Sequence, residues 1–255
     1  MLREFRADLH IHTCLSPCAS LDLSPLKIVE QAEAARLDII AITDHNTAKN
    51  VRAVMRLGEN RGLKIIPGME VQTREEIHLL TLFPDWPSAA AWDAEVYEHL
   101  PDVGNDPEFF GDQPIVDEEG NILGFEGRLL LNSIDLSLEE VKRRVERGGG
   151  VMIPSHFDKK SFSLISQLGL IPEEMELLAL EMSRLSEFSE RGGGFNVSSR
   201  IPKIVSSDAH RLQDIGSAHT LFLLAGASLG ELSLAFRGQE GRRIVRRIDR
   251  GVILL

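Results

Sequence analysis

The chain has 255 residues, of which 43% are hydrophobic and 26% charged, which is ordinary for a soluble globular enzyme and excludes a disordered or fibrous protein. Its formal net charge of −11 at pH 7 argues against non-specific binding to nucleic acid or to an anionic membrane, because phosphate groups are held mainly by Lys and Arg. No apolar stretch reaches the ~20 residues of a membrane span. The first residues run directly into an expected strand rather than a secretory leader, so a cytoplasmic location is expected.

Strand and helix patterns alternate along the first part of the chain. Ser24 and Pro25 are typical of a helix start, and a second helix is expected over residues 47–60. This alternation predicts parallel strands with the helices outside. The apolar runs that predict strands here cover residues 5–12, 38–43, 64–70 and 76–83.

The alternation breaks between about residues 84 and 136. A helix is expected over residues 89–100, but residues 101–127 are rich in Asp, Glu, Gly and Pro and lack strong periodicity. A segment of this kind in a compact enzyme is usually a lid, a specificity loop or an inserted flap. Ser137 and Glu140 then form a capping-box pattern for a helix that ends near Gly148.

Further apolar runs bring the expected strands to about seven or eight, enough to close a barrel or nearly so. The chain is therefore expected to be one domain, residues 1–255, with an inserted loop or flap at about 84–136. The arginine-rich segment 242–250 predicts either an edge strand or helix with a solvated face, or a patch for a polyanionic partner. The later strands are expected over residues 151–155, 177–182, 202–206 and 219–223.

Residue types that bind metal ions recur at the ends of the expected strands. His10 and His12 share one face of the first strand, about 6 to 7 Å apart, because alternate side chains of an extended chain point the same way. The two histidines outside this pattern, His99 and His219, are expected to be structural or surface residues. The further candidates expected at the same mouth of the barrel are His45, Glu70, His78, His156, Asp208 and His210.

These motifs resemble the PHP (polymerase and histidinol phosphatase) domain family, and they follow its order along nearly the whole chain. The resemblance implies an α/β fold of the distorted (β/α)7 TIM-like barrel type, two or three divalent metal ions (zinc, manganese or iron) and hydrolysis of phosphate esters. The motifs are AspLeuHisIleHisThr at 8–13, ThrAspHis at 43–45, Glu70 after the third strand, the isolated histidines, and SerAspAlaHis at 207–210.

The resemblance also implies ligands for each metal. The first ion would be held by His10, His12, Glu70 and Asp208. The second would be held by Glu70, His78 and His156, and the third by His45 and His210.

Cys18 stands where several trinuclear relatives of the family have a histidine. Its thiolate is therefore a candidate ligand of the third metal, which zinc and ferrous iron accept and manganese favours less. The equal alternative is a small buried packing residue, which is also the role expected of Cys14. With only these two cysteines, no disulfide framework is expected.

This set of residues would supply a hydrolytic mechanism. Glu70 would hold two cations ~3.5 to 4 Å apart, and a water bridging them would lose its proton near pH 7. The proton for the departing alkoxide is expected from a metal-bound water or from His210 or His45, which with Asp208 are the candidate catalytic residues. Asp8 is expected either to orient a ligand histidine or to be structural.

Four cations are candidates for contact with the substrate phosphate beyond the metals. Arg184 and Arg211 follow expected strand ends, and Lys159 and Lys160 follow His156. The alternative for each is a solvated surface cation. Asn46 is expected either to hydrogen-bond substrate or to begin the following helix.

The leading hypothesis for function is a metal-dependent phosphoesterase that acts on a small phosphorylated metabolite or nucleotide, with nucleic acid and membranes not expected as partners. The first alternative is a 3′ to 5′ nuclease or phosphodiesterase, which the net charge disfavours and the arginine-rich segment favours. The second is a non-catalytic module in which metals staple a barrel used for regulation. Amide or cyclic amidine hydrolysis ranks third, because that class commonly uses a carbamylated lysine where this chain has Glu70.

Overall fold

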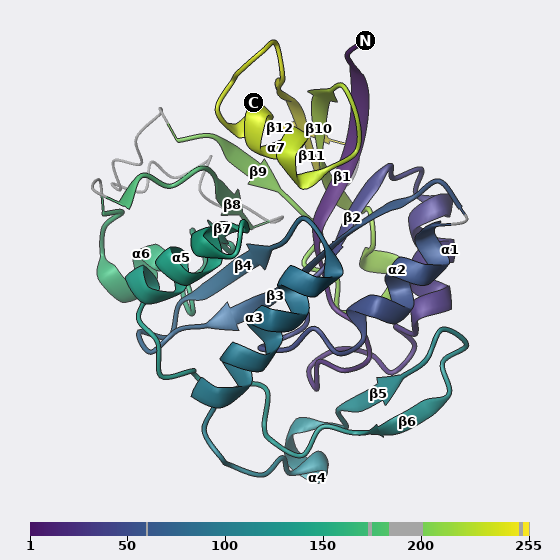
Figure 1. Ribbon diagram of the computed structural model, residues 1–255, viewed down its shortest axis with the longest axis vertical. Coiled ribbons are helices and arrows are strands. Elements are labelled where there is room, and N and C mark those ends of the chain that lie inside the picture. Colours follow the sequence, from purple (N-terminus) through teal and green to yellow (C-terminus); the bar gives the residue numbers. More distant parts are fainter. Residues whose placement is uncertain (60, 173–174, 184–200, 250–251, 255) are drawn as a thin grey trace.

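Eight strands form the main sheet of the described residues, in the order β12-β11-β10-β1-β2-β3-β4-β7, and β8-β9 and β5-β6 form two small sheets (Figure 1). The structure, a computed structural model, describes residues 1–59, 61–172, 175–183, 201–249 and 252–254. The strands are β1 (Arg3–Ile11), β2 (Ile39–Ile42), β3 (Lys64–Gln72), β4 (His78–Leu82), β5 (Pro114–Val116), β6 (Ile122–Phe125), β7 (Val151–Pro154), β8 (Leu180–Met182), β9 (Lys203–Val205), β10 (Ala218–Leu224), β11 (Arg243–Asp249) and β12 (Val252–Leu254). The helices are α1 (Pro25–Ala34), α2 (Val51–Glu59), α3 (Trp86–His99), α4 (Pro107–Phe110), α5 (Leu138–Arg147), α6 (Leu164–Leu168), α7 (Leu229–Phe236) and the 3-10 helix η3 (Leu212–Asp214).

Strand direction departs from the expected parallel pattern at two places. β1, β2 and β3 are parallel, but β4 is antiparallel to both β3 and β7, and β10 is antiparallel to β1. Only residues 73–77 separate β3 from β4. A parallel crossover needs a dozen or more residues, whereas a connection this short can only turn back as a hairpin. The expectation of parallel strands was therefore wrong for β4, and antiparallel β10 also departs from the parallel strands of a (β/α)7 barrel.

One apolar core fills the inside of the curled sheet. Leu232 and Phe236 of α7 cover one end of this core. The hydrogen-bonded ladder, however, is not continuous between β7 and β8 in the described residues. The finding is thus a curled α/β sheet around a barrel-like core, and a closed (β/α)7 barrel is not shown. The strand residues in the core come from β1, β2, β3, β4, β7, β9 and β10 and from the position before β8; they include Leu9, Ala41, Ile66, Leu80, Ile153, Ala179, Ile204 and Phe222.

A second apolar layer lies between the sheet and the outer helices. In α1 the predicted start at Pro25 is confirmed, and the helix buries Ile28, Val29 and Ala32. The capping box predicted from Ser137 is present at the start of α5. No helix in the described part of the chain has both the length and the apolar character needed to cross a membrane.

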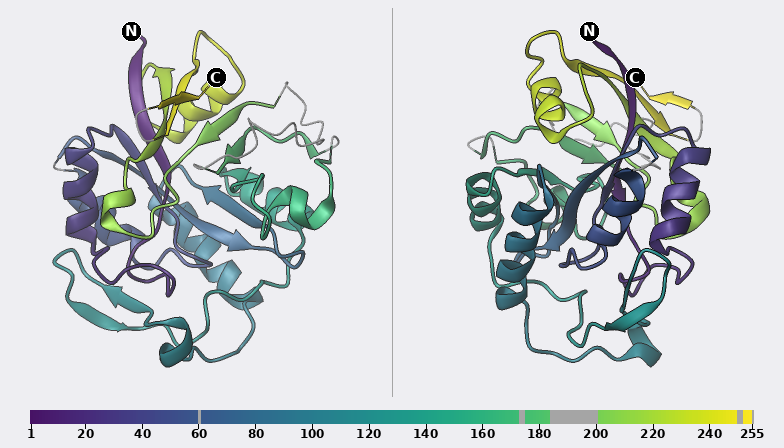
Figure 2. Two further views of the ribbon diagram at one scale, coloured as in Figure 1. Left: turned by 180° about the vertical axis from the view of Figure 1, so that it is seen from behind. Right: turned by 45° about the vertical axis from the view of Figure 1, so that its right-hand side comes forward.

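The irregular middle of the chain divides into a core helix and a separate lobe. Trp92 of α3 is buried and donates a hydrogen bond from Nε1 to Oγ1 of Thr81 over 3.1 Å, so α3 belongs to the layer against the sheet. Residues 101–134, here called the insert, carry α4 and the β5-β6 hairpin. In all views the insert forms a lobe at the end of the molecule opposite the chain's N-terminus (Figures 1 and 2).

The arginine-rich segment forms β11, which pairs with β10 on one side and β12 on the other. It is therefore a strand, but not the edge strand that was one of its two expected forms. Arg242, just before β11, donates from Nη2 to Glu231 over 3.1 Å. Arg250 lies outside the described residues.

Candidate metal centre

Eight side chains of metal-binding type converge at one end of the curled sheet. The carboxyl ends of β1, β2, β3, β7 and β9 meet there, and antiparallel β4 brings its first residue, His78, to the same place. The short connection between β3 and β4 is therefore what places His78 beside Glu70. The converging side chains are His10, His12, His45, Glu70, His78, His156, Asp208 and His210.

Glu70 lies at the middle of this group and is 1% exposed. Its Oε1 is 3.4 Å from Nε2 of His10, 3.2 Å from Nδ1 of His78 and 3.3 Å from Nε2 of His156. Its Oε2 is 3.5 Å from Nε2 of His12 and 3.3 Å from Nδ1 of His45. The two oxygens of one carboxylate thus face different sets of imidazole nitrogens.

Asp208 forms the second acidic point of the group. Its Oδ1 lies 3.4 Å from Nε2 of His10, 3.6 Å from Nε2 of His12 and 3.4 Å from Nδ1 of His210. Its other oxygen, Oδ2, accepts a hydrogen bond from Nζ of Lys159 over 2.6 Å. The inner oxygen therefore faces the histidines while the outer oxygen faces a cation.

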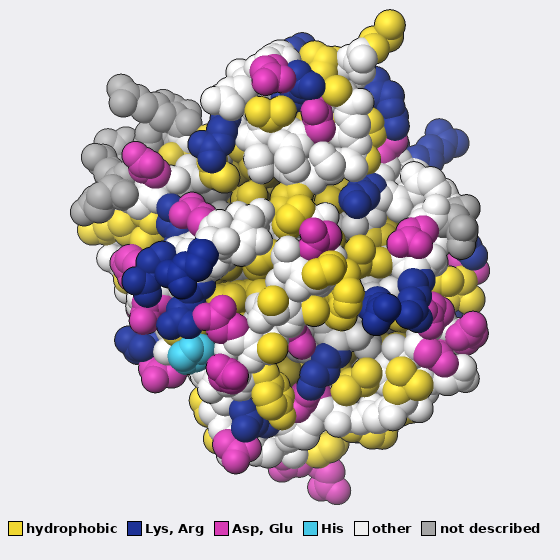
Figure 3. Space-filling view, viewed as in Figure 1, with side chains coloured by type: hydrophobic (Ala, Val, Ile, Leu, Met, Phe, Trp, Pro, Cys, Tyr) yellow, Lys and Arg dark blue, Asp and Glu magenta, His cyan; other side chains and the backbone are white. Residues whose placement is uncertain are grey.

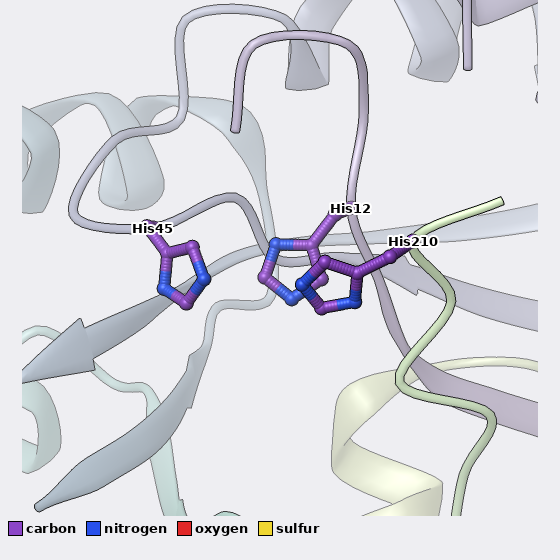
Figure 4. Close-up of side chains that lie close together, drawn as sticks. All are labelled: His12, His45 and His210. Carbon is purple, nitrogen blue, oxygen red and sulfur yellow. The ribbon is translucent and has the colours of Figure 1, made fainter. Parts of the chain in front are cut away.

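Three overlapping clusters within the described residues have ligand atoms that all lie within 4.8 Å of one another. In one of them, the rings of His12, His45 and His210 lie side by side (Figure 4), with centroids 4.6 Å apart for His12 and His45 and 4.2 Å apart for His12 and His210. The other two clusters are His10, His12 and Asp208, and His45, Glu70 and His78.

The spacing and bonding of these atoms fit divalent metal ions. Two ligands each 2.0–2.1 Å from a tetrahedral ion lie about 3.4 Å apart, and the nitrogen-to-oxygen distances around Glu70 are 3.2 to 3.5 Å. Oε1 of Glu70 and Nδ1 of His78 are also buried without a hydrogen-bond partner, although they face each other. Buried polar atoms are normally paired, so a bound cation between them would satisfy both.

The charges of the group are strongly coupled. Burial alone would raise the pKa of Glu70, but the imidazoles of His78 and His10 hold it well below its usual range. Burial opposes protonation of His10, but the charges of Glu181, Glu70 and Asp208 outweigh it and raise the pKa of His10 well above its ordinary value. In the metal-free centre the ionised carboxylate of Glu70 therefore lies beside a protonated His10. A metal ion that binds to this ring would displace its proton.

The rings of His45 and His210 are held neutral. Burial, followed by the charge of His12, lowers the pKa of His45 well below its ordinary value. The same two causes lower the pKa of His210 to about 4. A neutral imidazole is the form that binds a metal ion.

Cys18 does not belong to any of the three clusters. The residue as a whole is exposed, although desolvation of the thiol and then the charge of Glu70 raise its pKa to about 12. A thiol with so high a pKa is protonated in the metal-free protein, and Cys18 as a ligand of a third ion stays a prediction. Cys14 is buried, in agreement with the expected packing role.

Polar side chains behind the histidines hold the rings in place, and the sequence did not reveal them. Nδ1 of His10 lies 2.9 Å from Oε2 of Glu181, and Nδ1 of His12 lies 2.9 Å from Oγ of Ser16. Nε2 of His78 lies 3.0 Å from Oε1 of Gln72. Carboxylate, hydroxyl and amide groups in this position set which ring nitrogen carries the proton. A buried acid in the short apolar run LeuGluMet was the only available signal for Glu181.

Asp8 does not orient a ligand histidine, which was one of the two roles expected for it. Its oxygens accept from the backbone amides of Ser207 and Gly216, each over 2.9 Å, and burial raises its pKa to about 6. Asp8 therefore ties β1 to the segment that carries Asp208. This is the structural alternative.

Two residues of the centre have a left-handed backbone. The φ angle is +27° at His156 and +49° at Asp208. Side chains other than glycine rarely adopt this conformation, and it persists where the surroundings enforce it, often at functional sites. At His156 the backbone amide donates to Oε2 of Glu181 over 3.1 Å, so one carboxylate holds both the ring of His10 and the turn at His156.

The cations expected to contact phosphate are dispersed. Lys159 lies at Asp208, Lys160 and Arg211 are exposed, and Arg184 lies outside the described residues. Asn46 neither caps a helix nor faces the cluster. Its Nδ2 donates to the carbonyl oxygens of Leu130 and Asn132 in the insert.

The two histidines set aside from the site lie elsewhere. Nε2 of His99 is 3.3 Å from Nη1 of Arg144, at the end of α3. His219 on β10 is buried, and its Nδ1 lies 3.2 Å from the carbonyl oxygen of Gly216.

Comparison with known proteins relates this geometry to a family. Residues 8–146 match the PHP domain, and residues 197–238 match a PHP-associated segment. An uncharacterized protein of Methanocaldococcus jannaschii, MJ1587, is 34% identical over 92 residues, which cover 32% of this chain and 53% of that protein.

Solved structures share the fold. The lesion-specific endonuclease PfuEndoQ from Pyrococcus furiosus superposes with a TM-score of 0.69 at 20% identity, covering 96% of this chain and 58% of that chain. Endonuclease Q in complex with a 27-mer duplex that carries an abasic lesion gives 0.65 at 18% identity, covering 97% and 60%. A protein assigned as a metal-dependent phosphoesterase from Bifidobacterium adolescentis gives 0.52 at 17% identity, covering 80% and 87%. At such identities the likeness shows the fold alone.

The match to the family includes five of the eight converging side chains, from His10 to His78, and more than half of the chain. The chain spans a little over half the length of MJ1587 and of the endonuclease Q structures. Because the PHP domain match covers more than half of its residues, this chain belongs to the PHP domain family.

Proposed function

We propose that this protein is a metal-dependent hydrolase of phosphate esters whose active site is the cluster around Glu70. The observation that carries the proposal is the arrangement of Glu70 itself, a buried carboxylate with each oxygen 3.2 to 3.5 Å from imidazole nitrogens. Two or three divalent ions held there would lower the pKa of a bound water and offset the negative charge of a phosphoryl group.

Each proposed ion has its own set of ligands, and Glu70 is shared by the first two. His10, His12, Glu70 and Asp208 would hold the first, and Glu70, His78 and His156 the second. His12, His45 and His210 form the remaining cluster, so a third ion there would be held by His45 and His210 beside the ring of His12. Zinc, manganese and iron all accept such nitrogen and oxygen ligands.

The protein's own residues would position the substrate and supply a proton. Burial opposes the charge on Lys159, but Asp208 outweighs it and raises the pKa of Lys159, which therefore stays a cation. Its Nζ could hold a phosphoryl oxygen next to the metals. The proton for the leaving group would come from a metal-bound water or from His210 or His45, although burial keeps both rings neutral in the metal-free protein.

A small phosphorylated metabolite or nucleotide is the substrate class we favour. A cavity of about 170 Å³ beside Asp208 and Lys159 is lined by the further described residues His156, Glu181, Met182, Ser183, Ser206 and Ser207, and it is small beside the 300–1,000 Å³ typical of ligand pockets. The insert carries eight acidic residues and one arginine, a composition that repels a polyanion.

DNA is the second candidate substrate, because two of the structural neighbours are endonuclease Q proteins that cover nearly the whole of this chain. The expectation that nucleic acid is not a partner finds no support in these neighbours. On the face drawn in Figure 3, however, the Lys and Arg side chains form small groups among Asp and Glu rather than a continuous band. Phosphate backbones are bound mainly by such bands of Lys and Arg.

The test is hydrolysis of a panel of monoesters and diesters by protein loaded with zinc, manganese or iron, measured as phosphate released from the monoesters and as alcohol or shortened oligonucleotide released from the diesters. Single-stranded DNA and duplex DNA with an abasic site are added to the same panel. We expect release from a small monoester, and loss of at least a hundredfold in Asp208→Asn. Cleavage of DNA alone would select the second candidate, and inactivity toward every ester would favour a metal-stapled module without catalysis.

A further inference from the structure

The insert is joined to the metal centre by buried hydrogen bonds. The first path begins at Asn50, a fully buried residue directly before α2. Oδ1 of Asn50 accepts from the backbone amide of Val116 over 3.0 Å, and Nδ2 donates to the carbonyl oxygen of Pro114 over 3.2 Å. Both partners lie in β5 of the insert. The same Nδ2 donates to Oγ1 of Thr13 over 3.1 Å.

From Thr13 the path continues to a ring of the metal centre. Oγ1 of Thr13 and Oγ of Ser16 each donate to Asp44, over 2.7 and 2.6 Å. Because the Ser16 proton is used on Asp44, its oxygen can only accept from Nδ1 of His12, over 2.9 Å. Nδ1 of His12 therefore carries the proton, and Nε2 is free to face Glu70. All the side chains between the insert and this ring are fully buried.

A second path starts at the other end of the insert. Oγ of Ser133 accepts from Nε2 of Gln72 over 2.8 Å, and Oε1 of Gln72 accepts from Nε2 of His78 over 3.0 Å. In the neutral, metal-binding form of the ring this bond places the proton on Nε2, so the free nitrogen is Nδ1, which faces Glu70 without a partner. Asn46 also connects the insert to Gln72. Its Oδ1 accepts from the backbone amide of Gln72, and its Nδ2 donates to two backbone carbonyl oxygens of the insert.

We propose that Asn50 and Gln72 are positioning residues through which the insert sets the tautomer and orientation of His12 and His78. This inference rests on the metal centre of the proposed function. Because linkage is reciprocal, attachment of the insert strengthens metal binding, and bound metal in turn secures the insert. A substrate or partner that pulls the insert away would weaken metal binding without touching a ligand.

A third contact between the insert and the body supplies the control. Nη1 of Arg56 in α2 donates to Oε1 of Glu118 in the insert over 2.5 Å. The pair is exposed, and within the described residues no hydrogen bond continues from it to a histidine of the centre. Loss of this pair removes a surface contact between the insert and the body without altering either path.

The experiment measures metal affinity by chelator competition, with Zn²⁺ and Mn²⁺ separately, and hydrogen exchange of the insert amides with and without metal. The variants are Ser133→Ala, Ser133→Thr, Asn50→Asp and the control Arg56→Gln. Ser133→Ala leaves Gln72 and His78 intact but removes the acceptor in the insert. We expect a loss of metal affinity of about tenfold in Ser133→Ala and Asn50→Asp, typical of groups behind metal ligands.

Ser133→Thr keeps the hydroxyl and should restore the affinity, and Arg56→Gln should keep it. In the unsubstituted protein, metal should slow exchange at Val116 and Ile134. Circular dichroism checks that each variant is folded, and Ser16→Ala replaces Asn50→Asp if that variant is not. No substrate is present, so failure to hydrolyse esters would not bear on this result. The coupling would be overturned if Ser133→Ala bound metal with unchanged affinity and metal also left the exchange rates of the insert amides unchanged. A protein that binds no metal would overturn it as well.

Discussion

Glu181 and His10 are 171 residues apart in the chain, yet Oε2 of Glu181 lies 2.9 Å from Nδ1 of His10, and both side chains are almost fully buried. The same oxygen accepts from the backbone amide of His156. One carboxylate outside the proposed ligand set therefore holds two of the histidines that face Glu70. Such carboxylate–histidine pairs fix the ring and make its other nitrogen a better ligand.

This relationship predicts the effect of Glu181→Gln, which keeps the shape of the side chain and removes its charge. Metal affinity should fall about tenfold or more, because His10 loses the partner that raises its basicity. The measurement is chelator competition at pH 7.5. Glu240→Gln, at an exposed ion pair with Arg242, is the control and should bind metal normally. Equal affinity in both variants would show that Glu181 has no influence on the centre.

Cys18→Ser tests whether the thiol holds a metal ion. Since Cys18 lies outside the three ligand clusters, the number of ions bound per chain should be unchanged in this variant. Elemental analysis after reconstitution with zinc and with iron checks this. A stoichiometry lower by one ion would instead support the family-based expectation of a cysteine ligand.

Gly68→Ala should destabilise the sheet. A Cβ at Gly68 would lie 2.6 Å from the carbonyl oxygen of Thr81, a backbone atom held by the β3-β4 pairing. Overpacking of this kind costs about 1 to 3 kcal/mol, and each kcal/mol lowers Tm by about 2 to 4 °C in a domain of this size. Gly124→Ala in β6 is the matched control, because a Cβ there meets nothing within 4 Å. In thermal unfolding, Gly68→Ala should therefore have a lower Tm than Gly124→Ala. Equal Tm values would contradict the close packing at Gly68.

The stability of the metal-free protein should fall as the pH drops below the ordinary pKa of histidine, in part because of His219. Burial lowers the pKa of His219, and its Nε2 is buried without a partner. The unfolded chain thus binds a proton at a higher pH than the folded chain, so the contribution is present above about pH 6.5 and is lost as the pH falls toward the folded pKa.

His219→Asn isolates this contribution, since an asparagine amide can still donate to the carbonyl oxygen of Gly216 but does not titrate. Urea unfolding in the presence of a chelator should show a smaller loss of stability between pH 7.5 and pH 5.5 in the variant than in the unsubstituted protein. The other histidines titrate in both proteins and cancel in the comparison. An equal loss in both would contradict this role of His219.

The sequence predicted the meeting of the eight side chains of the candidate metal centre better than it predicted the sheet. His10, His12 and Glu70 stand out because polar ligand types rarely occupy the ends of apolar strands without a reason. The predicted direction of β4 was wrong because an alternation of strands and helices, as in the first part of this chain, is typical of parallel sheets. The five residues between β3 and β4 already exclude a parallel crossover.

The side chains behind the ligands could not be found from sequence patterns. Ser16, Gln72 and Glu181 act through neighbours that only the folded chain brings together, and each is an unremarkable residue in its own segment. The opposite error occurred at Asp8, whose place beside His10 suggested a role that the backbone amides of Ser207 and Gly216 take up instead. Local patterns identify ligand types, whereas partners depend on three-dimensional packing.

The most direct test of the central claim is the number of divalent ions bound per chain, measured by elemental analysis of reconstituted protein beside its Glu70→Gln variant. Since both oxygens of Glu70 face imidazole nitrogens, the protein should bind at least two ions, and the variant should lose most of them. A folded protein that binds no ions, or a Glu70→Gln variant that binds them as before, would contradict the account.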